Sequence, residues 1–251
     1  MERKRFTILE NNPEVFNALS QKMGLSPSLT FYDIYSLDSD TFSYIPRPVY
    51  ALIVIIPLTP AWKKDRIAED EALGDPTTYY DGGQASKGPD SPIIWFKQII
   101  HDACGSYAFI HSAINGETRN FIEKDSILDK IRNKAIPLAK DERAEVLYQD
   151  KEYEEAHQSV GLMGDTEAPT IRDHIHLGQH FVGYVKANGH LWELEGSREG
   201  PLDRGELKED EDVLSPKALE LGLKRIIELE LASGGHDLRF SCIALAPKKV
   251  E

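Results

Sequence analysis

The sequence predicts an α/β fold, in the broad sense that includes α+β arrangements, with strands set between helices. One observation is the run Val49 to Pro57, which is apolar and β-branched at consecutive positions, as in a strand buried on both faces. A second is the turn Asn188-Gly189 between two apolar runs, a strong short-range signal for a β-hairpin. The third is a set of helical patterns between the strand patterns, at 102–115, 125–134, 141–155 and 215–232.

The first elements follow from local signals. Asn12 and Pro13 are typical of an N-cap and a first helical position, so we expect a short helix that ends near Gly24. A strand is expected next, over 29–35. Residues 62–91 are polar and contain several glycines and prolines, so we interpret them as a flexible surface excursion. Further strands are expected at 180–186, 190–194 and 239–246.

Composition limits the class of protein. The 251 residues are 41% hydrophobic, which suffices for a packed core, and we expect a single domain over residues 1–251. We find no signal peptide, and the longest apolar stretch, Tyr50 to Leu58, is shorter than the ~20 residues that a membrane helix needs. Two cysteines are too few for a disulfide framework, so we expect thiols in a reducing compartment. A formal net charge of −13 argues against nucleic acid as a partner, and it fits either a basic partner or a solvated acidic surface.

Cys104 lies where an apolar stretch gives way to a helical pattern. A thiol at a helix N-terminus faces unpaired N–H groups and the positive end of the helix dipole, and both favour the thiolate. A backbone N–H there can also donate to an oxyanion, and Gln98, six residues upstream, offers a second donor. The alternative is a small buried hydrophobic residue, which is the interpretation we give to Cys242.

A cysteine nucleophile needs a base, and the base needs an acceptor that orients it. His180 begins one strand of the predicted hairpin and Glu195 ends the other, so the two should meet at the same edge. His101 is a weaker candidate base, because neighbours on a strand or helix point apart from one another. His111 is expected to pack inside the helical layer. Few potential metal ligands cluster in the sequence, so we expect neither a metal nor a cofactor.

Six segments in this order resemble the ubiquitin C-terminal hydrolases, a family of papain-like cysteine peptidases with a knotted fold. They are ILENNPEVFNALSQKMGLSPSLTFYDIYSLD, IPRPVYALIVIIPLT, KQIIHDACGSYAFIHS, AHQSVGLMGDTEAP, HFVGYVKANGHLWELEG and RFSCIAL. The resemblance runs nearly end to end. It implies a central antiparallel sheet flanked by helices.

The resemblance also implies the catalytic roles. Cys104 would be the nucleophile, and His180 the general base and then the general acid. Gln98, with the backbone N–H of Cys104, would form the oxyanion hole. Glu195 stands where the family has an Asp that orients the histidine, and its extra methylene shifts the carboxylate by more than ~1 Å unless the backbone adjusts. Asp102 and Ser106 stand where the family more often shows Asn and Thr.

Substrate contacts are implied in the same way. Glu10, Glu14 and Asp33 fall where the family contacts the basic tail of ubiquitin, and a carboxylate can bind an arginine there through two hydrogen bonds. The segment from Ala156 to Gln179 would form a loop that crosses over the active site and favours small adducts and short peptides.

The expected function is hydrolysis after the C-terminal glycine of ubiquitin, through a thioester. One alternative is a hydrolase for a ubiquitin-like protein such as NEDD8, and another is a weakly active ubiquitin-binding module. We expect a monomer that acts without nucleic acid or membrane, in the cytoplasm or, as an alternative, also in the nucleus.

Overall fold

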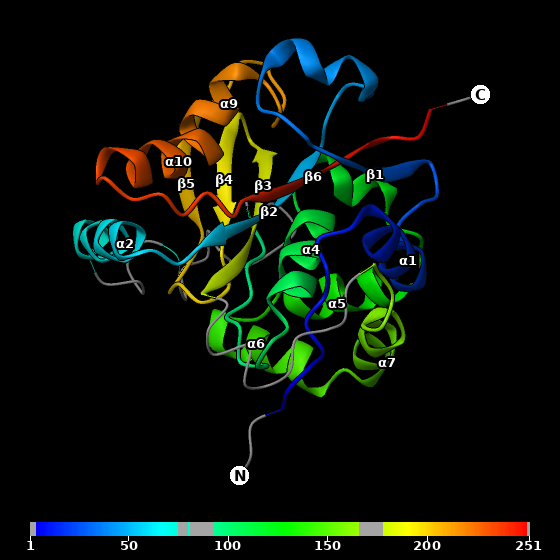
Figure 1. Cartoon of the computed structure of the whole chain (residues 1–251). Helices are drawn as coiled ribbons and strands as arrows, with labels where there is room; N and C mark the ends of the chain where they lie inside the picture. Colours follow the sequence, from blue (N-terminus) through cyan, green and yellow to red (C-terminus); the bar gives the residue numbers. More distant parts are fainter. Residues whose placement is uncertain (1–3, 75–79, 81–92, 166–177, 250–251) are drawn as a thin grey trace.

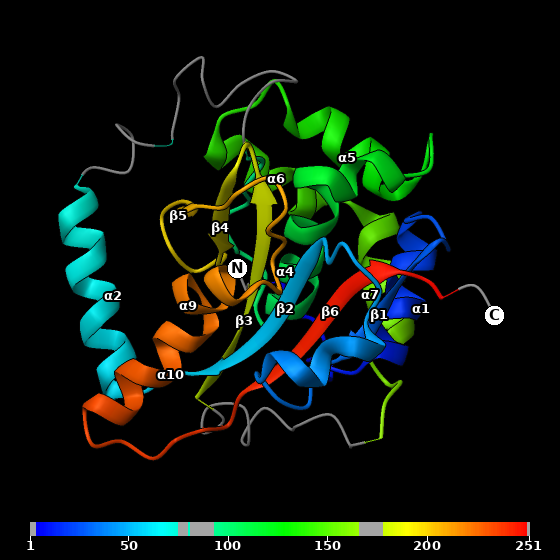
Figure 2. The ribbon, with the colours of Figure 1, turned by 90° about the horizontal axis from the view of Figure 1, so that it is seen from above.

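A six-stranded antiparallel sheet divides the molecule into two helical layers (Figures 1 and 2). The computed structural model describes residues 4–74, 80, 93–165 and 178–249. The order of the strands in the sheet is β1-β6-β2-β3-β4-β5. Their bounds are β1 Leu29–Asp33, β2 Ala51–Pro57, β3 Gln179–Ala187, β4 His190–Leu194, β5 Leu202–Glu206 and β6 Ser241–Pro247. This arrangement confirms the expected α/β fold with a central antiparallel sheet.

Helices cover both faces of this sheet, as both views of the ribbon show (Figures 1 and 2). One layer holds α1 Pro13–Met23, α4 Cys104–Ile114, α5 Ile127–Ala135, α6 Lys140–Gln149 and α7 Lys151–Val160. The other layer holds α2 Pro60–Leu73, α9 Pro216–Leu221 and α10 Leu223–Ala232. Two 3₁₀ segments, η1 Ser39–Tyr44 and η3 Gly116–Phe121, complete the described elements.

Strand β2 is buried on both faces, as its run of consecutive apolar residues predicts. Ile53 belongs to the core beneath α1 and α4, together with Phe109. Its neighbours Leu52 and Val54 belong to the second core, together with Leu219 of α9. A strand between two helical layers has no solvent face, so the alternation of apolar and polar residues is lost.

The β3–β4 hairpin has the predicted turn. Asn188 and Gly189 both have positive φ, 52° and 77°, which a two-residue hairpin turn of this hand requires. Ala187 pairs with His190 directly beside the turn, and Gly183 pairs with Leu194 at the far end. The hairpin therefore carries His180 and Glu195 to the same end of the sheet.

The expected excursion over 62–91 is wrong for its first part, where α2 continues as a helix to Leu73. Thr59 caps this helix by accepting a hydrogen bond from the Trp62 N–H at 3.2 Å. Trp62 is its one fully buried residue among those described, so the helix carries almost no apolar periodicity for a sequence pattern to detect. Residues 75–79 and 81–92 lie outside the described residues.

Two expected helices are each divided in two. The pattern over 141–155 corresponds to α6 and α7, and Asp150 between them caps α7 by accepting from the Tyr153 N–H at 2.9 Å. The pattern over 215–232 corresponds to α9 and α10, which meet at Gly222. A β-carbon at Gly222 would lie 3.0 Å from the ring of Tyr184, so the break lets the chain pass close to β3.

No described helix has both the length and the hydropathy to cross a membrane. That residues 1–251 form a single catalytic domain stays a prediction.

Candidate active site

A cleft of about 430 Å³ lies at the end of the sheet where β3 begins and β4 ends. Its lining includes three of the predicted catalytic residues, Gln98, Cys104 and His180. Ser197, two residues after Glu195, lies in the wall of the same cleft. The fold therefore gathers at one place residues that are nearly a hundred positions apart in the sequence.

Cys104 is the first residue of α4 and is partly exposed. Ala103 stands at the N-cap and has no side-chain acceptor, so the first N–H groups of the helix are not capped by that residue. Asp102, just before it, has φ 65°, a left-handed conformation that Asp and Asn tolerate better than most residues. Its carboxylate forms an ion pair with Arg5, which ties the N-terminal segment to the approach to the nucleophile.

A buried hydrogen-bonded group supports the first turn of α4. The Ser106 hydroxyl lies 2.7 Å from the Tyr153 hydroxyl and 3.0 Å from His157 Nδ1. The other ring nitrogen of His157 lies 2.7 Å from the Thr7 carbonyl oxygen. Burial lowers the pKa of His157 to about 4, against a smaller opposing effect of the Thr7 carbonyl, so this histidine is a neutral structural group.

His180 and Glu195 meet as predicted. His180 Nε2 lies 2.8 Å from Glu195 Oε1, and the Glu195 side chain is only 1% exposed. Despite this short distance, His180 Nε2 has no hydrogen-bond partner of good geometry among the described residues. The N–H bond therefore does not point directly at the oxygen. The contact is therefore a close ion pair whose alignment is not linear.

The charges of this pair are strongly coupled. Burial alone would lower the pKa of His180, but the charge of Glu195 and the neighbouring Cys104 raise it to about 10. Burial would raise the pKa of Glu195, but His180, Arg66 and Ser197 lower it to about 2. At neutral pH the imidazole is cationic and the glutamate is anionic.

Gln98 is held next to the loop that follows the acid. Its backbone N–H donates to the Gly196 carbonyl at 2.8 Å, and its side-chain Nε2 donates to the Ile100 carbonyl at 3.1 Å. Its Oε1 is buried with no hydrogen-bond partner among the described residues. A β-carbon at Gly196 would lie 3.0 Å from that of Gln98, so glycine is needed for this approach. The amide must turn away from Ile100 to donate to an oxyanion.

The other candidates of the sequence lie where a structural role explains them. His101 is exposed on the rim of the cleft, on a β-bridge with Arg5. His111 is fully buried and accepts from the Phe96 N–H at 2.9 Å, and burial lowers its pKa to about 3. Cys242 is buried in β6, where burial raises the pKa of its thiol.

The three predicted ubiquitin-contacting acids do not line the described cleft. Glu10 accepts from the Asp165 N–H at 3.1 Å, and so it holds the start of the predicted crossover loop. Glu14 is exposed in the first turn of α1, and Asp33 ends β1 with the exposed Tyr35 hydroxyl 3.2 Å away. Their contacts with a substrate stay predictions.

The predicted loop from Ala156 to Gln179 is wrong at both ends. Residues up to Val160 continue α7, and Gln179 begins β3. The centre of the predicted loop, 166–177, lies outside the described residues. Its role as a cover for the active site therefore stays a prediction.

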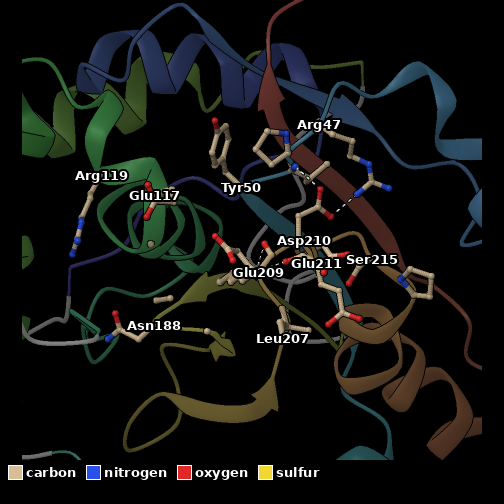
Figure 3. A pocket seen from close by; sticks show the side chains of 18 residues that line it. Arg47, Tyr50, Glu117, Arg119, Asn188, Leu207, Glu209, Asp210, Glu211 and Ser215 are labelled. Carbon is tan, nitrogen blue, oxygen red and sulfur yellow. Dashed lines mark hydrogen bonds and ion pairs between the residues drawn. The ribbon is translucent and has the colours of Figure 1, made fainter.

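A larger cavity, about 1100 Å³, lies at the opposite end of β3 around the Asn188-Gly189 turn (Figure 3). Acidic side chains, among them Glu117 and Glu209, border it, and an ion pair joins Arg47 to Asp212 there. The described residues that line it include none of the four predicted catalytic residues.

Sequence reasoning missed the groups behind Glu195. Ser197 donates to Glu195 Oε1 from its backbone N–H at 2.9 Å and from its hydroxyl. Arg66 Nη1 and Arg198 Nε lie 3.5 and 3.7 Å from Glu195 Oε2. The signal available for Ser197 was its position two residues after the acid. Arg66 had none, because its helix was not predicted.

Comparison with known proteins agrees with this geometry. A ubiquitin carboxyl-terminal hydrolase of Drosophila melanogaster is 28% identical over 240 residues, covering 96% of each chain. One of Aplysia californica is 31% identical over 207 residues, covering 82% of this chain and 89% of the relative. The fold is similar to that of the Trichinella spiralis UCH37 catalytic domain bound to ubiquitin vinyl methyl ester, with a TM-score of 0.71 and 20% identity over 98% of this chain and 96% of that one.

The family model described as ubiquitin carboxyl-terminal hydrolase, family 1, matches residues 6–228. This match covers the predicted catalytic residues Cys104, His180 and Glu195 and the first five of the six segments, and so it confirms the resemblance. The chain therefore belongs to the ubiquitin carboxyl-terminal hydrolases of family 1.

Proposed function

We propose that this protein is a thiol hydrolase that cleaves after the C-terminal glycine of ubiquitin, through a thioester on Cys104. The observation that carries the proposal is the position of His180, which is held by Glu195 and lines the same cleft as Cys104 at the start of α4. A cysteine at a helix N-terminus beside a cationic imidazole is the arrangement that activates a thiol for acyl transfer.

The first half of the reaction forms the acyl-enzyme. In the proposed reaction, the Cys104 sulfur attacks the carbonyl carbon of the terminal glycine as a thiolate, while the imidazole of His180 carries the proton. The carbonyl oxygen becomes an oxyanion, which accepts hydrogen bonds from the Cys104 N–H and from Gln98 once its amide has turned. The imidazolium then donates its proton to the leaving amine or alcohol, and the carbon–nitrogen or carbon–oxygen bond breaks.

The second half releases ubiquitin. His180, now neutral, accepts a proton from a water molecule whose oxygen attacks the thioester carbonyl. The carbon–sulfur bond breaks, the sulfur leaves as the thiolate beside the protonated His180, and the released carboxylic acid loses its proton to solvent to become the carboxylate. Glu195 keeps its negative charge throughout and stabilises the imidazolium each time it forms.

Recognition of the substrate follows from charge. The protein has a net charge of −13, which favours encounter with the basic C-terminal tail of ubiquitin. We propose that Glu10, Glu14 and Asp33 contact this tail and that the loop predicted between Ala156 and Gln179 limits the size of the leaving group. A hydrolase for NEDD8 is the alternative within the same chemistry. We expect a cytoplasmic monomer.

The direct test is hydrolysis of ubiquitin–aminomethylcoumarin by the wild-type protein and by Cys104→Ala. We expect turnover by the wild type, and Cys104→Ala should abolish turnover while keeping ubiquitin binding. The NEDD8 conjugate assayed in parallel distinguishes the two substrates by their kcat/KM. Absence of turnover by wild type, with free ubiquitin still bound, would leave the binding module as the function.

A further inference from the structure

Glu195 is held by a side chain that comes directly after its own turn. The Ser197 N–H and the Ser197 hydroxyl both donate to Glu195 Oε1, the same oxygen that lies 2.8 Å from His180 Nε2. Two donors on one carboxylate oxygen restrict the rotation of the carboxylate about its last bond. Glu195 Oε1, which faces the imidazole of His180, is therefore held in place by Ser197.

Arg66 of α2 holds Ser197 in turn. Its Nη1 donates to the Ser197 hydroxyl oxygen at 2.9 Å and its Nη2 donates to the Ser197 carbonyl oxygen at 2.7 Å. The same Nη1 lies 3.5 Å from Glu195 Oε2. One guanidinium thus contacts both the acid and the residue that clamps it, in the planar two-donor geometry that arginine provides.

The guanidinium of Arg66 is held in position by neighbouring side chains of α2. Its guanidinium lies 5.2 Å from the ring centre of Trp62, one turn earlier on α2, in a cation–π arrangement. Asp70, one turn later, lies 3.7 Å from Arg66 Nε. The neighbouring Arg198, 2% exposed, fastens the turn to α2 by donating to Glu69 and Asp70, each at 2.8 Å. Helix α2 is therefore a rigid support for the acid.

We propose that Ser197 and Arg66 are positioning residues that set the Glu195 carboxylate against His180, and that this clamp is built for glutamate. The inference rests on the proposed function of Glu195 as the acid of the site. Glutamate has one more rotatable bond than aspartate, so its carboxylate needs more restraint to stay within the tolerance of a catalytic group. The contacts of Ser197 and Arg66 supply that restraint at both carboxylate oxygens.

The first test compares Ser197→Ala, Arg66→Gln and Arg66→Lys with the wild-type protein. We expect kcat/KM for ubiquitin–aminomethylcoumarin to fall about tenfold for Ser197→Ala and Arg66→Gln, the rate equivalent of one charge-assisted hydrogen bond. Arg66→Lys should recover part of the loss through its charge. The matched control is Arg47→Gln, which removes an arginine–carboxylate ion pair, that with Asp212, beside the cavity at the other end of β3. It should keep wild-type activity.

A second readout follows His180 itself. In Ser197→Ala, which changes no charge, the Glu195 carboxylate can rotate away from the imidazole and stabilises its proton less well, so the pKa of His180 and the alkaline limb of the kcat/KM profile should move to lower pH. The imidazole can be titrated by NMR with labelled histidine, assigned through His180→Asn, and this needs no ubiquitin. A wild-type protein without turnover would therefore refute the proposed function while the titration still tests the clamp.

The Glu195→Gln background separates positioning from general stability. A residue that acts through the acid has nothing to position once the acid is gone, so Ser197→Ala should change the residual rate less than about twofold there. Glu195→Asp should be about tenfold slower than wild type, because its carboxylate is withdrawn by one methylene from a fixed clamp. The inference is overturned by an unchanged or faster Ser197→Ala, an equal loss in the Glu195→Gln background, or a Glu195→Asp variant as fast as wild type.

Discussion

The two ends of β3 carry two different cavities. At its start, the cleft of about 430 Å³ contains Cys104 and His180. At its other end, the cavity of about 1100 Å³ surrounds Lys186 and the hairpin turn. Both are lined by charged and polar side chains from several elements, so neither size nor polarity separates them.

The two cavities differ in whether their polar groups form hydrogen bonds with one another. In the larger cavity, the Lys186 ammonium donates to the carbonyl oxygens of Lys208, Glu209 and Glu211. In the smaller cleft, Gln98 Oε1 is buried without a hydrogen-bond partner among the described residues. Satisfied groups stabilise a fold, whereas groups left incomplete are available to a substrate. We therefore expect the polar groups at the hairpin end of β3 to act mainly in stability, and those at its start to act in catalysis.

The largest effect should come from His180→Asn at the start of β3. We expect kcat/KM for ubiquitin–aminomethylcoumarin to fall about a thousandfold, because a general acid–base group contributes about 10² to 10⁴ to the rate. The variant also leaves the buried Glu195 charge without its cation, so the midpoint of thermal unfolding should fall as well, and the rate is compared per folded molecule. Steady-state kinetics and a thermal melt on the same preparation give both values.

Lys186→Met, at the other end of β3, is the matched comparison and should affect stability and not activity. It leaves three carbonyl oxygens without their donor, so the free energy of unfolding should fall by about 1–3 kcal/mol. The activity per folded molecule should equal that of wild type. A large loss of activity in Lys186→Met would show that the two ends of the strand are not separate in role.

An intermediate effect is expected for Gln98→Ala. Loss of one oxyanion donor should lower kcat by about 10²-fold and leave KM nearly unchanged, because the donor acts on the transition state. The starting geometry, in which Nε2 donates to Ile100, gives the amide a second resting position. An unchanged kcat would mean that the amide stays on Ile100 and that the Cys104 N–H acts alone.

The position of the site was predictable because local signals made its members candidates and the resemblance to the family assigned their roles. The Asn188-Gly189 turn fixes the hairpin register, and that register takes His180 and Glu195 to one end of the sheet. Cys104 was identified by the change from an apolar stretch to a helix, and it begins α4. What the sequence did not show is the support behind the acid, since Arg66 reaches Glu195 from a helix 129 positions earlier.

The fold was predictable where apolar burial repeats with a regular period. The prediction failed where ion pairs or steric fit, instead of regularly spaced apolar residues, hold an element in place. Helix α2 is fastened through its acids to Arg198, Arg204 and Arg225, and it buries only Trp62 among the described residues. Strand β5 was missed because its sequence, LDRGE, alternates no apolar residues and contains a glycine. Such elements are determined by their partners in space.

The most gradual expected effect is the pH dependence of stability, which again should distinguish the two ends of β3. The pKa of His180 is raised from 6.5 to about 10, so its contribution is fully present below pH 6.5 and is lost as pH rises through 10. Between pH 7 and 9 the free energy of unfolding should therefore fall with pH, by at most about 1.4 kcal/mol per unit for one proton.

The pH range of this test ends at pH 9, because the Cys242 thiol also affects stability above that pH. The thiol loses its proton near its ordinary pKa of 9.0 in the unfolded chain but keeps it when it is buried in the folded protein. Urea unfolding at several pH values should show the fall in wild type and in Lys186→Met, and a nearly flat dependence in His180→Asn. If His180→Asn kept the wild-type slope, the proton that stabilises this end of the sheet would not be on the imidazole, and His180 would have to be neutral beside Glu195. The attack of Cys104 would then require His180 to remove the thiol proton during the reaction.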